Sequence, residues 1–278
     1  MKKTIIVVLY KQLIEESKTF QTLKSSLFTS EHNLDQLEII LYDNSPVEQS
    51  FDASTYGHVK ITYMHDARNL GIATAYNVGW SVAKSNNSEW LLLFDHDTEI
   101  TKEYVDAVMT IEEVDKTVSG IVPVVNCEGT MISPVFSHSL RPLQGERPVV
   151  GIQEEPVMAI NSGTLIRTSF LNEIGGFNTE FSLDYLDHWL FYEIYSRGNK
   201  VLLLDVTLEH ELSVMDYSRV SLDRYESIIK SEMNFYRNYK KELLSAYRFQ
   251  LLKRALKQVL LVKNKQIAYC TFKKFLTL

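Results

Sequence analysis

Short, continuous apolar runs recur along the first 125 residues of this chain, and segments with apolar residues at helical spacing separate them. Apolar β-branched runs are typical of parallel strands buried on both faces, whereas a spacing of three to four residues indicates an amphipathic helix. The alternation of the two patterns predicts a doubly wound α/β sheet. We expect strands at residues 4–10, 37–42, 59–64, 90–94 and 120–125, and helices at residues 13–28, 72–83 and 104–114.

The second half of the chain is less regular. Residues 126–158 contain four of the six prolines, and we expect long loops with short strands there. Beyond them the pattern predicts strands at 157–166 and 201–204, helices at 169–174 and 185–195, and a helical, basic segment at 218–262. The sequence therefore predicts one large domain, residues 1–216, followed by a basic amphipathic helical extension, residues 217–278.

The composition is that of an ordinary globular protein, with 45% hydrophobic and 23% charged residues. The two cysteines, Cys127 and Cys270, are too few and too far apart for a disulfide framework or a zinc site, which fits a reducing cytoplasm. The apolar run at residues 5–10 is too short for a signal peptide, and no stretch approaches the roughly 18 apolar residues of a membrane span.

Charge is distributed unevenly along the chain. Residues 217–278 carry 14 Lys/Arg and four Asp/Glu, whereas residues 1–216 carry 15 Lys/Arg and 31 Asp/Glu, which together give the net charge of −6. The acidic body disfavours nucleic-acid binding. Basic residues interleaved with aromatic and aliphatic ones suit peripheral contact with an anionic membrane surface, on the inner face of the cell membrane. The alternative is a helix pair that packs on the body and exposes a basic face, and we expect a mixture of both.

The chemistry is concentrated at predicted strand ends. Tyr10 and Asp43 each end a strand, and an apolar strand delivers Asp95 and Asp97, two residues apart, at its tip. In open α/β sheets, ligands bind beyond the carboxyl ends of the strands. Two carboxylates on one face repel each other unless a divalent cation lies between them, and Mg²⁺ or Mn²⁺ there would bind a diphosphate. The alternative is a turn in which the aspartates cap the next helix.

An ordered set of short motifs extends this interpretation over residues 4–212. The set comprises the first strand, Tyr42-Asp43-Asn44-Ser45, Arg68-Asn69-Leu70-Gly71-Ile72-Ala73 with Ala75, Asn77 and Gly79, Asp95-His96-Asp97, Ser162-Gly163-Thr164-Leu165-Ile166-Arg167, Ile174-Gly175-Gly176-Phe177, and Leu183-Asp184-Tyr185-Leu186-Asp187-His188-Trp189. In this order the motifs resemble the inverting glycosyltransferases of family 2, which have the GT-A fold, and especially their rhamnosyltransferase-like branch.

The resemblance implies a role for each predicted site residue. Asp43 would contact the nucleotide base, Tyr10 would lie at the same crevice, and residues 69–77, including Asn69, Gly71 and Asn77, would form the donor-binding loop and helix start. Arg68 could pair with a phosphate. Asp95 and Asp97 would hold the metal and the diphosphate, with His210 as a further metal or diphosphate ligand, and Asp187 would be the catalytic base. The structural alternatives stay open: a capped turn for Asp43, a surface ion pair for Arg68, and tight helix–sheet packing for Gly71 and Gly79.

Asp187 would need a raised pKa to accept a proton from a sugar hydroxyl, and the apolar residues around it could provide that environment. Asp184 is the better candidate for the helix N-cap. The family often has an acidic residue directly before the base, whereas Leu186 occupies that position here, which favours the rhamnosyltransferase-like branch.

The function expected from the sequence is metal-dependent transfer of rhamnose or a hexose from a dTDP- or UDP-sugar to a polysaccharide or lipid-linked acceptor. One alternative is a catalytically silent nucleotide-sugar-binding or assembly protein of the same fold. Another is a phosphatase of the haloacid-dehalogenase type, which also has Asp-x-Asp at a strand end. That class usually places the motif on its first strand, whereas here the motif follows the fourth predicted strand. That class also has Thr or Val at the position that Glu99 occupies in this chain.

Overall fold

A computed structural model describes residues 1–57, 59–127, 129–140, 142–210 and 221–278 of the chain. The strands are β1 (Lys3–Leu9), β2 (Leu37–Asp43), β3 (Lys60–His65), β4 (Trp90–Asp95), β5 (Thr98–Glu99), β6 (Val118–Cys127), β7 (Thr130–Ser133), β8 (Val135–Phe136), β9 (Gly151–Gln153), β10 (Val157–Met158), β11 (Thr164–Arg167) and β12 (Lys200–His210). The helices are α1 (Lys18–Ser26), α2 (Ile72–Ser85), α3 (Lys102–Met109), α4 (Thr168–Ile174), α5 (Leu186–Ser196), α6 (Leu222–Asn238), α7 (Leu244–Leu261) and α8 (Lys265–Thr277).

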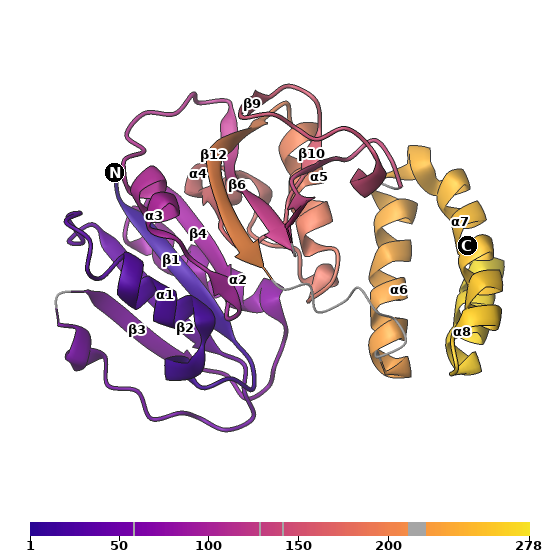
Figure 1. Cartoon of the computed structure of the whole chain (residues 1–278), viewed down its shortest axis with the longest axis horizontal. Coiled ribbons are helices and arrows are strands. Elements are labelled where there is room, and N and C mark those ends of the chain that lie inside the picture. Colours follow the sequence, from indigo (N-terminus) through magenta and orange to yellow (C-terminus); the bar gives the residue numbers. More distant parts are fainter. Residues whose placement is uncertain (58, 128, 141, 211–220) are drawn as a thin grey trace.

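The main sheet is mixed, with the strand order β3-β2-β1-β4-β11-β6-β12-β5, and it curves through the body of the molecule (Figure 1). Strands β1 to β4 are parallel to one another, and β12 is parallel to β6. Strand β11 runs antiparallel to both of its neighbours, β4 and β6. The predicted α/β class with a mixed, doubly wound sheet is therefore confirmed.

Alternating side chains of the central strand feed two apolar cores, one on each face of the sheet. Ile6 and Val8 of β1 join the core that α2, α4 and α5 cover, whereas Ile5, Val7 and Leu9 join the core beneath α1 and α3. Successive residues of a strand point to opposite faces, so a strand buried on both faces must be apolar throughout. The uninterrupted run seen in the sequence has this cause.

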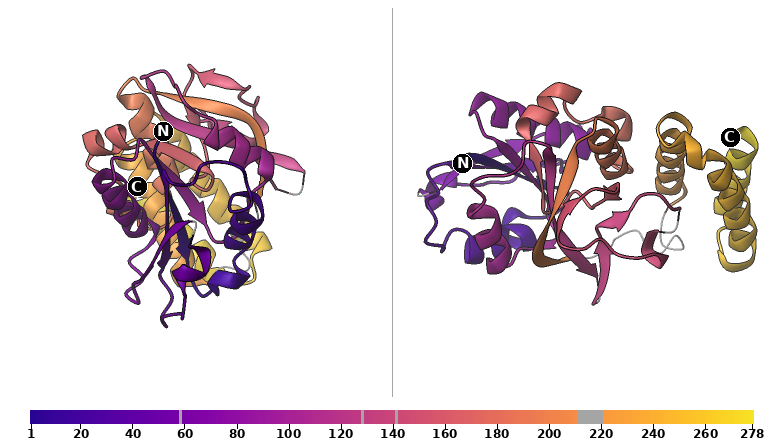
Figure 2. Two further views of the ribbon diagram at one scale, coloured as in Figure 1. Left: turned by 90° about the vertical axis from the view of Figure 1, so that its left-hand side faces the viewer. Right: turned by 90° about the horizontal axis from the view of Figure 1, so that it is seen from above.

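The three C-terminal helices extend the first of these cores. Tyr225, Ile229, Phe235 and Tyr236 of α6 belong to the same buried cluster as Trp189 of α5. Helices α7 and α8 form a hairpin at the end of the molecule that lies farthest from β3 (Figures 1 and 2). The extension therefore packs on the body, while the predicted boundary at residue 216 lies outside the described residues. None of the described helices has both the length and the apolar character that crossing a membrane requires.

Three predicted elements have different limits. The predicted helix at 13–28 is divided at Ser17, whose hydroxyl accepts a hydrogen bond from Phe20 N–H and caps α1. The predicted strand at 157–166 is two short strands, β10 and β11, separated by a turn. Gly163 in that turn has φ +83°, and a Cβ there would lie 2.7 Å from Leu208, so the backbone turns where only glycine fits. The basic helical segment continues beyond residue 262 as α8.

Candidate active site

The carboxyl ends of the central strands meet at one edge of the sheet. In the strand register Leu9 lies opposite Asp43 of β2, and Val8 lies opposite Asp95 of β4. Tyr10 follows β1 directly and is 40% exposed there. The structure thus brings Tyr10, Asp43 and Asp95 to one edge although they are far apart in the sequence.

The turn between β10 and β11 braces the tip of β4. The backbone N–H of Asp95 donates to Ser162 Oγ at 3.0 Å, and Ser162 Oγ is 2.6 Å from the hydroxyl of Thr98. The hydroxyl of Thr19, near the start of α1, donates to the carbonyl oxygens of both Asp95 and Thr98. These buried contacts fix the backbone that carries Asp95 and Asp97.

Three acidic side chains interact electrostatically at this tip. Partial burial, together with the negative charges of Asp97 and Asp187, raises the pKa of Asp95 to about 7. Asp95 also lies 3.4 Å from the hydroxyl of Tyr76, a fully buried residue of α2. Burial raises the pKa of this phenol well above its usual value, and the same three aspartates add to the effect. Asp95, Asp97 and Asp187 therefore occupy one acidic neighbourhood.

The chemistry of these side chains fits a hard divalent cation. Asp95 and Asp97 offer carboxylate oxygens, the ligands that Mg²⁺ and Mn²⁺ prefer, and a cation would relieve the repulsion that raises the pKa of Asp95. The backbone of His210 at the end of β12 lies opposite Thr98 of β5, just past Asp97, but its side chain is outside the described part of the structure. Among the described side chains, no three His, Cys, Asp or Glu are grouped as metal ligands.

Asp187 lies in the first turn of α5. Its Oδ1 accepts a hydrogen bond from the backbone N–H of His188 at 2.8 Å. The N-cap of this helix is Tyr185, which has the left-handed φ of 65° and no capping side chain. The predicted N-cap role of Asp184 is therefore wrong. The carboxylate of Asp184 instead accepts hydrogen bonds from both terminal nitrogens of Arg224 in α6, so it joins the body to the C-terminal helices.

Asp43 is fully buried and already hydrogen-bonded. Its Oδ1 accepts from Ser45 N–H at 2.9 Å, and its Oδ2 accepts from Gln49 Nε2 at 2.8 Å and from the hydroxyl of Tyr63 at 2.9 Å. Asp43 therefore shapes the loop after β2, and its predicted contact with the nucleotide base stays a prediction.

Arg68 forms an ion pair with an aspartate that the sequence interpretation did not select. Its Nε and Nη2 donate to Asp66 at 2.8 and 2.7 Å, and these bonds hold the pKa of Asp66 well below its usual range. Asp66 Oδ2 also accepts a hydrogen bond from the hydroxyl of Tyr42 at 2.9 Å. Asp66 directly follows β3, and Asp95 ends β4, so both lie at the carboxyl end of a strand. This position in the sequence was the signal that could have identified Asp66 as a candidate site residue.

The predicted donor-loop residues hold the loop against the segment that leads to α5. The Asn77 amide donates to Phe177 O and accepts from Phe177 N–H, both at 2.8 Å. Gly71, with φ +92°, lies so close to Ser182 that a Cβ would be 2.3 Å from its carbonyl oxygen. Asn69 also has a positive φ, of 48°, in the turn before α2. Asn77 and Gly71 thus hold this loop in position, and their predicted part in donor binding stays a prediction.

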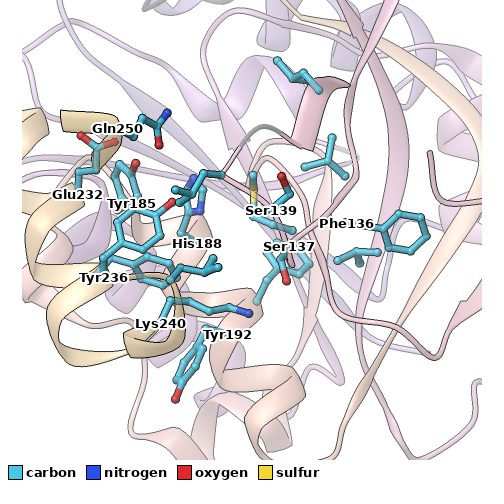
Figure 3. A pocket seen from close by; sticks show the side chains of 18 of the residues that line it. Phe136, Ser137, Ser139, Tyr185, His188, Tyr192, Glu232, Tyr236, Lys240 and Gln250 are labelled. Atoms are coloured by element: carbon cyan, nitrogen blue, oxygen red, sulfur yellow. The ribbon is translucent and has the colours of Figure 1, made fainter. Parts of the chain in front are cut away.

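A cavity of about 380 Å³ lies between the loops of residues 132–140 and 157–160 and helices α5, α6 and α7. Tyr185 and His188, on either side of Asp187 in the sequence, both line it. Figure 3 shows these two side chains with Tyr236 facing Ser137 and Ser139 across the space. The sequence pattern gave no sign of this cavity, because its walls come from several segments that are not adjacent in the chain.

The comparisons with known proteins agree with this geometry. The family model described as "Glycosyl transferase family 2" matches residues 4–175. The mannosyltransferase PcManGT from Pyrobaculum calidifontis, solved in complex with GDP-Man and Mn²⁺, superposes with a TM-score of 0.60 at 16% identity, over 98% of this chain and 74% of that chain. S. aureus TarS 1-349, solved in complex with UDP-GlcNAc, gives a TM-score of 0.61 at 18% identity, over 99% of this chain and 80% of that one. No curated protein matches the chain in sequence.

The fold is the GT-A fold of these glycosyltransferases. The chain belongs to glycosyl transferase family 2. The family assignment made from the sequence motifs is confirmed, whereas membership of the rhamnosyltransferase-like branch stays a prediction.

Proposed function

We propose that this protein transfers a sugar from a nucleoside diphosphate sugar to a hydroxyl group of a saccharide acceptor, with inversion at the anomeric carbon. The observation that carries the proposal is the shared neighbourhood of Asp187 with Asp95 and Asp97 at the carboxyl end of β4. One acid is thereby available for the acceptor, while the other two lie where a diphosphate and its cation would bind.

In this proposal Asp187 removes the proton from the acceptor hydroxyl as the oxygen attacks the anomeric carbon. The bond between that carbon and the phosphate oxygen breaks, and the electron pair leaves with the nucleoside diphosphate. Asp95 and Asp97 would hold a Mn²⁺ or Mg²⁺ ion, with His210 as a further ligand, and the ion would neutralise charge on the departing diphosphate. Ser162 and Tyr76 keep Asp95 in place.

The donor we propose is dTDP-rhamnose or a UDP-hexose. PcManGT was solved with GDP-Man and TarS 1-349 with UDP-GlcNAc, so the bases of these structural neighbours differ and a donor panel must include both. Tyr10 is exposed at the end of β1, where its ring is available to a base, and the Nζ of Lys11 lies 5.1 Å from the centre of that ring.

The acceptor we propose is a growing polysaccharide on a lipid carrier, which would give contact with a membrane surface a purpose. The end of α7, the turn after it and the first residue of α8 form residues 256–265, which we call the hairpin tip. Leu256, Leu260 and Leu261 are exposed there. Lys257, Lys263 and Lys265 are exposed in the same segment. Apolar side chains surrounded by lysines suit the interface of an anionic bilayer.

The first test is a thermal-shift panel of nucleoside diphosphates and nucleotide sugars, with Mn²⁺ or with a chelator. A ligand that binds the folded state raises the melting temperature. We expect a shift with at least one diphosphate, larger with the metal than in chelator. Binding that is equally strong in chelator would remove the metal from the proposal.

The second test is Asp187→Asn, assayed for transfer with the donor that the panel selects. Loss of a general base should lower kcat by about 10²- to 10⁴-fold and leave the donor-induced thermal shift intact. Asp223→Asn, at an exposed acid in the first turn of α6, is the matched control. Unchanged transfer by Asp187→Asn would exclude it as the base. Donor binding without turnover under any condition would favour a silent nucleotide-sugar-binding protein.

A further inference from the structure

We propose that the cavity between α5, α6, α7 and the loops of residues 132–140 and 157–160 binds a sugar ring of the acceptor, so that the C-terminal helices contribute to acceptor selection. This inference rests on the proposed function, because it concerns the second substrate of the same reaction. It extends that function by assigning α6 and α7, which lie beyond the segment matched to the family, to the substrate site.

The cavity lies against the segments that carry the reacting groups. Tyr185 and His188 line it and flank Asp187, whose charge acts on Asp95. Ile160 also lines it, and Ser162, which holds the backbone of Asp95, follows two residues later. The wall of the cavity is therefore continuous with the segment that carries Asp187, the proposed acceptor base.

One wall of the cavity is aromatic. The rings of Tyr185 and His188 stack at a centroid distance of 4.3 Å, and Phe235 lies 5.7 Å from Tyr185. Tyr192 and Tyr236 continue this wall. Ring faces carry partial negative charge, so they attract the weakly positive C–H groups on one face of a pyranose as well as burying that apolar face.

The same cavity also contains directed polar groups. Arg254 of α7 donates to both carboxylate oxygens of Glu232 of α6 at 2.7 and 2.8 Å, and both residues line the cavity together with Gln250. The pair is formally neutral, so it offers hydrogen bonds to hydroxyl groups without demanding a charged ligand. A hydrocarbon tail would exclude water from the amide of Gln250 without offering it a hydrogen bond, which is costly.

The size of the cavity is consistent with this ligand class. Its volume of about 380 Å³ falls at the lower end of the roughly 300–1,000 Å³ typical of small-molecule sites. An aromatic wall facing hydroxyl and amide groups, at that volume, suits a mono- or disaccharide. The serines of the opposite loop, Ser137 and Ser139, add hydroxyl groups on the far side (Figure 3).

The test uses the full chain and two substitutions in the cavity, Tyr192→Leu and Gln250→Ala. Methyl glycosides of rhamnose, glucose, galactose and N-acetylglucosamine, with matching disaccharides, serve as probes in saturation-transfer NMR. We expect at least one saccharide to bind the parent protein. Each substitution should weaken that binding about five- to tenfold, the loss expected for one hydrogen bond or ring contact. Tyr269→Leu, at an exposed tyrosine of α8 outside the cavity, is the matched control and should bind as the parent does.

Two further measurements keep the outcomes distinct. If the parent protein catalyses transfer, both cavity substitutions should raise the acceptor KM more than the donor KM. An equal effect on both, or saccharide binding that neither substitution changes, would overturn the inference. Binding of dodecyl phosphate but of no saccharide would also overturn it, in favour of a lipid site. Because NMR binding requires no turnover, absence of transfer would reject the proposed function without deciding the identity of the cavity ligand.

Discussion

Two regions of this molecule contain buried or partly buried acidic side chains, and the two differ in whether a positive charge compensates the carboxylate. At the tip of β4, Asp95 lies close to two other aspartates, and its pKa is raised to about 7. In the cavity, Glu232 is almost fully buried but accepts two hydrogen bonds from Arg254. The first arrangement costs folding free energy, whereas the second is compensated within the protein.

The difference indicates what each region is built for. Acids that repel one another in the folded protein gain most when a cation arrives, so the strand tip is suited to an ionic ligand. A buried pair with satisfied hydrogen bonds keeps a fixed geometry and offers directed polar groups, which suits recognition of a neutral ligand. Substitutions in the two regions should therefore affect stability in opposite directions.

The largest change in stability is expected for Glu232→Ala. It would leave the guanidinium of Arg254 buried beside the cavity without its carboxylate, and breaking such a pair costs about 3 kcal/mol. Urea unfolding measures the change. Glu226→Ala, at an exposed acid of the same helix, should stay within about 0.5 kcal/mol of the parent. A loss below about 1 kcal/mol for Glu232→Ala would contradict the assignment of a compensated buried pair.

Removing a charge at the strand tip should have the opposite sign. Because the pKa of Asp95 is about 7 in the folded protein and near 4 when unfolded, the native state binds more protons between these values. Stability of the metal-free protein should therefore fall as pH rises from about 4 through 7. Asp95→Asn should remove this slope and stabilise the protein at pH 8 by about 2 kcal/mol, allowing for partial solvent screening.

The measurement for Asp95 is urea unfolding in chelator between pH 5 and 8.5. Parent and Asp95→Asn curves that stay parallel across this range would show that the carboxyl has no raised pKa. Asp52→Asn, at an exposed turn acid whose pKa is lowered by Ser54, is the control, and it should lack the gain at pH 8.

A smaller effect is expected at the contact that links the donor loop to the segment before α5. Asn77→Ala removes two hydrogen bonds to the backbone of Phe177 and should cost about 1–2 kcal/mol. Since Asp187 follows that segment, kcat should fall while the donor-induced thermal shift persists. Asn172→Ala, which loses one exposed bond from Trp80, is the matched control. Loss of donor binding with unchanged kcat would instead show that Asn77 acts in donor binding.

The smallest change in folding stability is expected at the hairpin tip, whose lysines are exposed. Each lysine near an anionic surface contributes about 1 kcal/mol to vesicle binding. Lys257→Gln with Lys263→Gln should therefore weaken co-sedimentation with phosphatidylglycerol vesicles about tenfold or more, and neutral vesicles should bind poorly in every case. Lys102→Gln with Lys116→Gln, at exposed lysines of the body, is the control pair. Equal binding by both double variants would exclude the tip as the membrane contact.

The sequence predicted local features well where the signal was local. The apolar runs of β1, β2 and β4 are buried on both faces. Burial on both faces requires every successive residue to be apolar, so such strands are visible in the sequence. Asp95 and Asp97 follow such a run, so their place at the tip of a central strand could be read without the fold. The ordered motifs also identified the family, which the family model confirms.

The sequence did not determine which partner each polar side chain contacts. Asn77, Arg68 and Asp43 are hydrogen-bonded to Phe177, Asp66 and the loop after β2, partners that the sequence does not indicate, while their predicted ligand contacts stay predictions. Asp184 was selected as a helix cap and instead pairs with Arg224 of α6. These partners depend on which chain segments meet after folding.

The sequence by itself thus determined the strands, the acidic tip and the family, because burial on both faces and a strand-end motif leave traces in adjacent residues. Only the tertiary structure decided that α6 and α7 close a cavity beside Asp187 and that Glu232 meets Arg254 there. Such contacts join residues that are neighbours in space but not in the chain, and no periodicity records them.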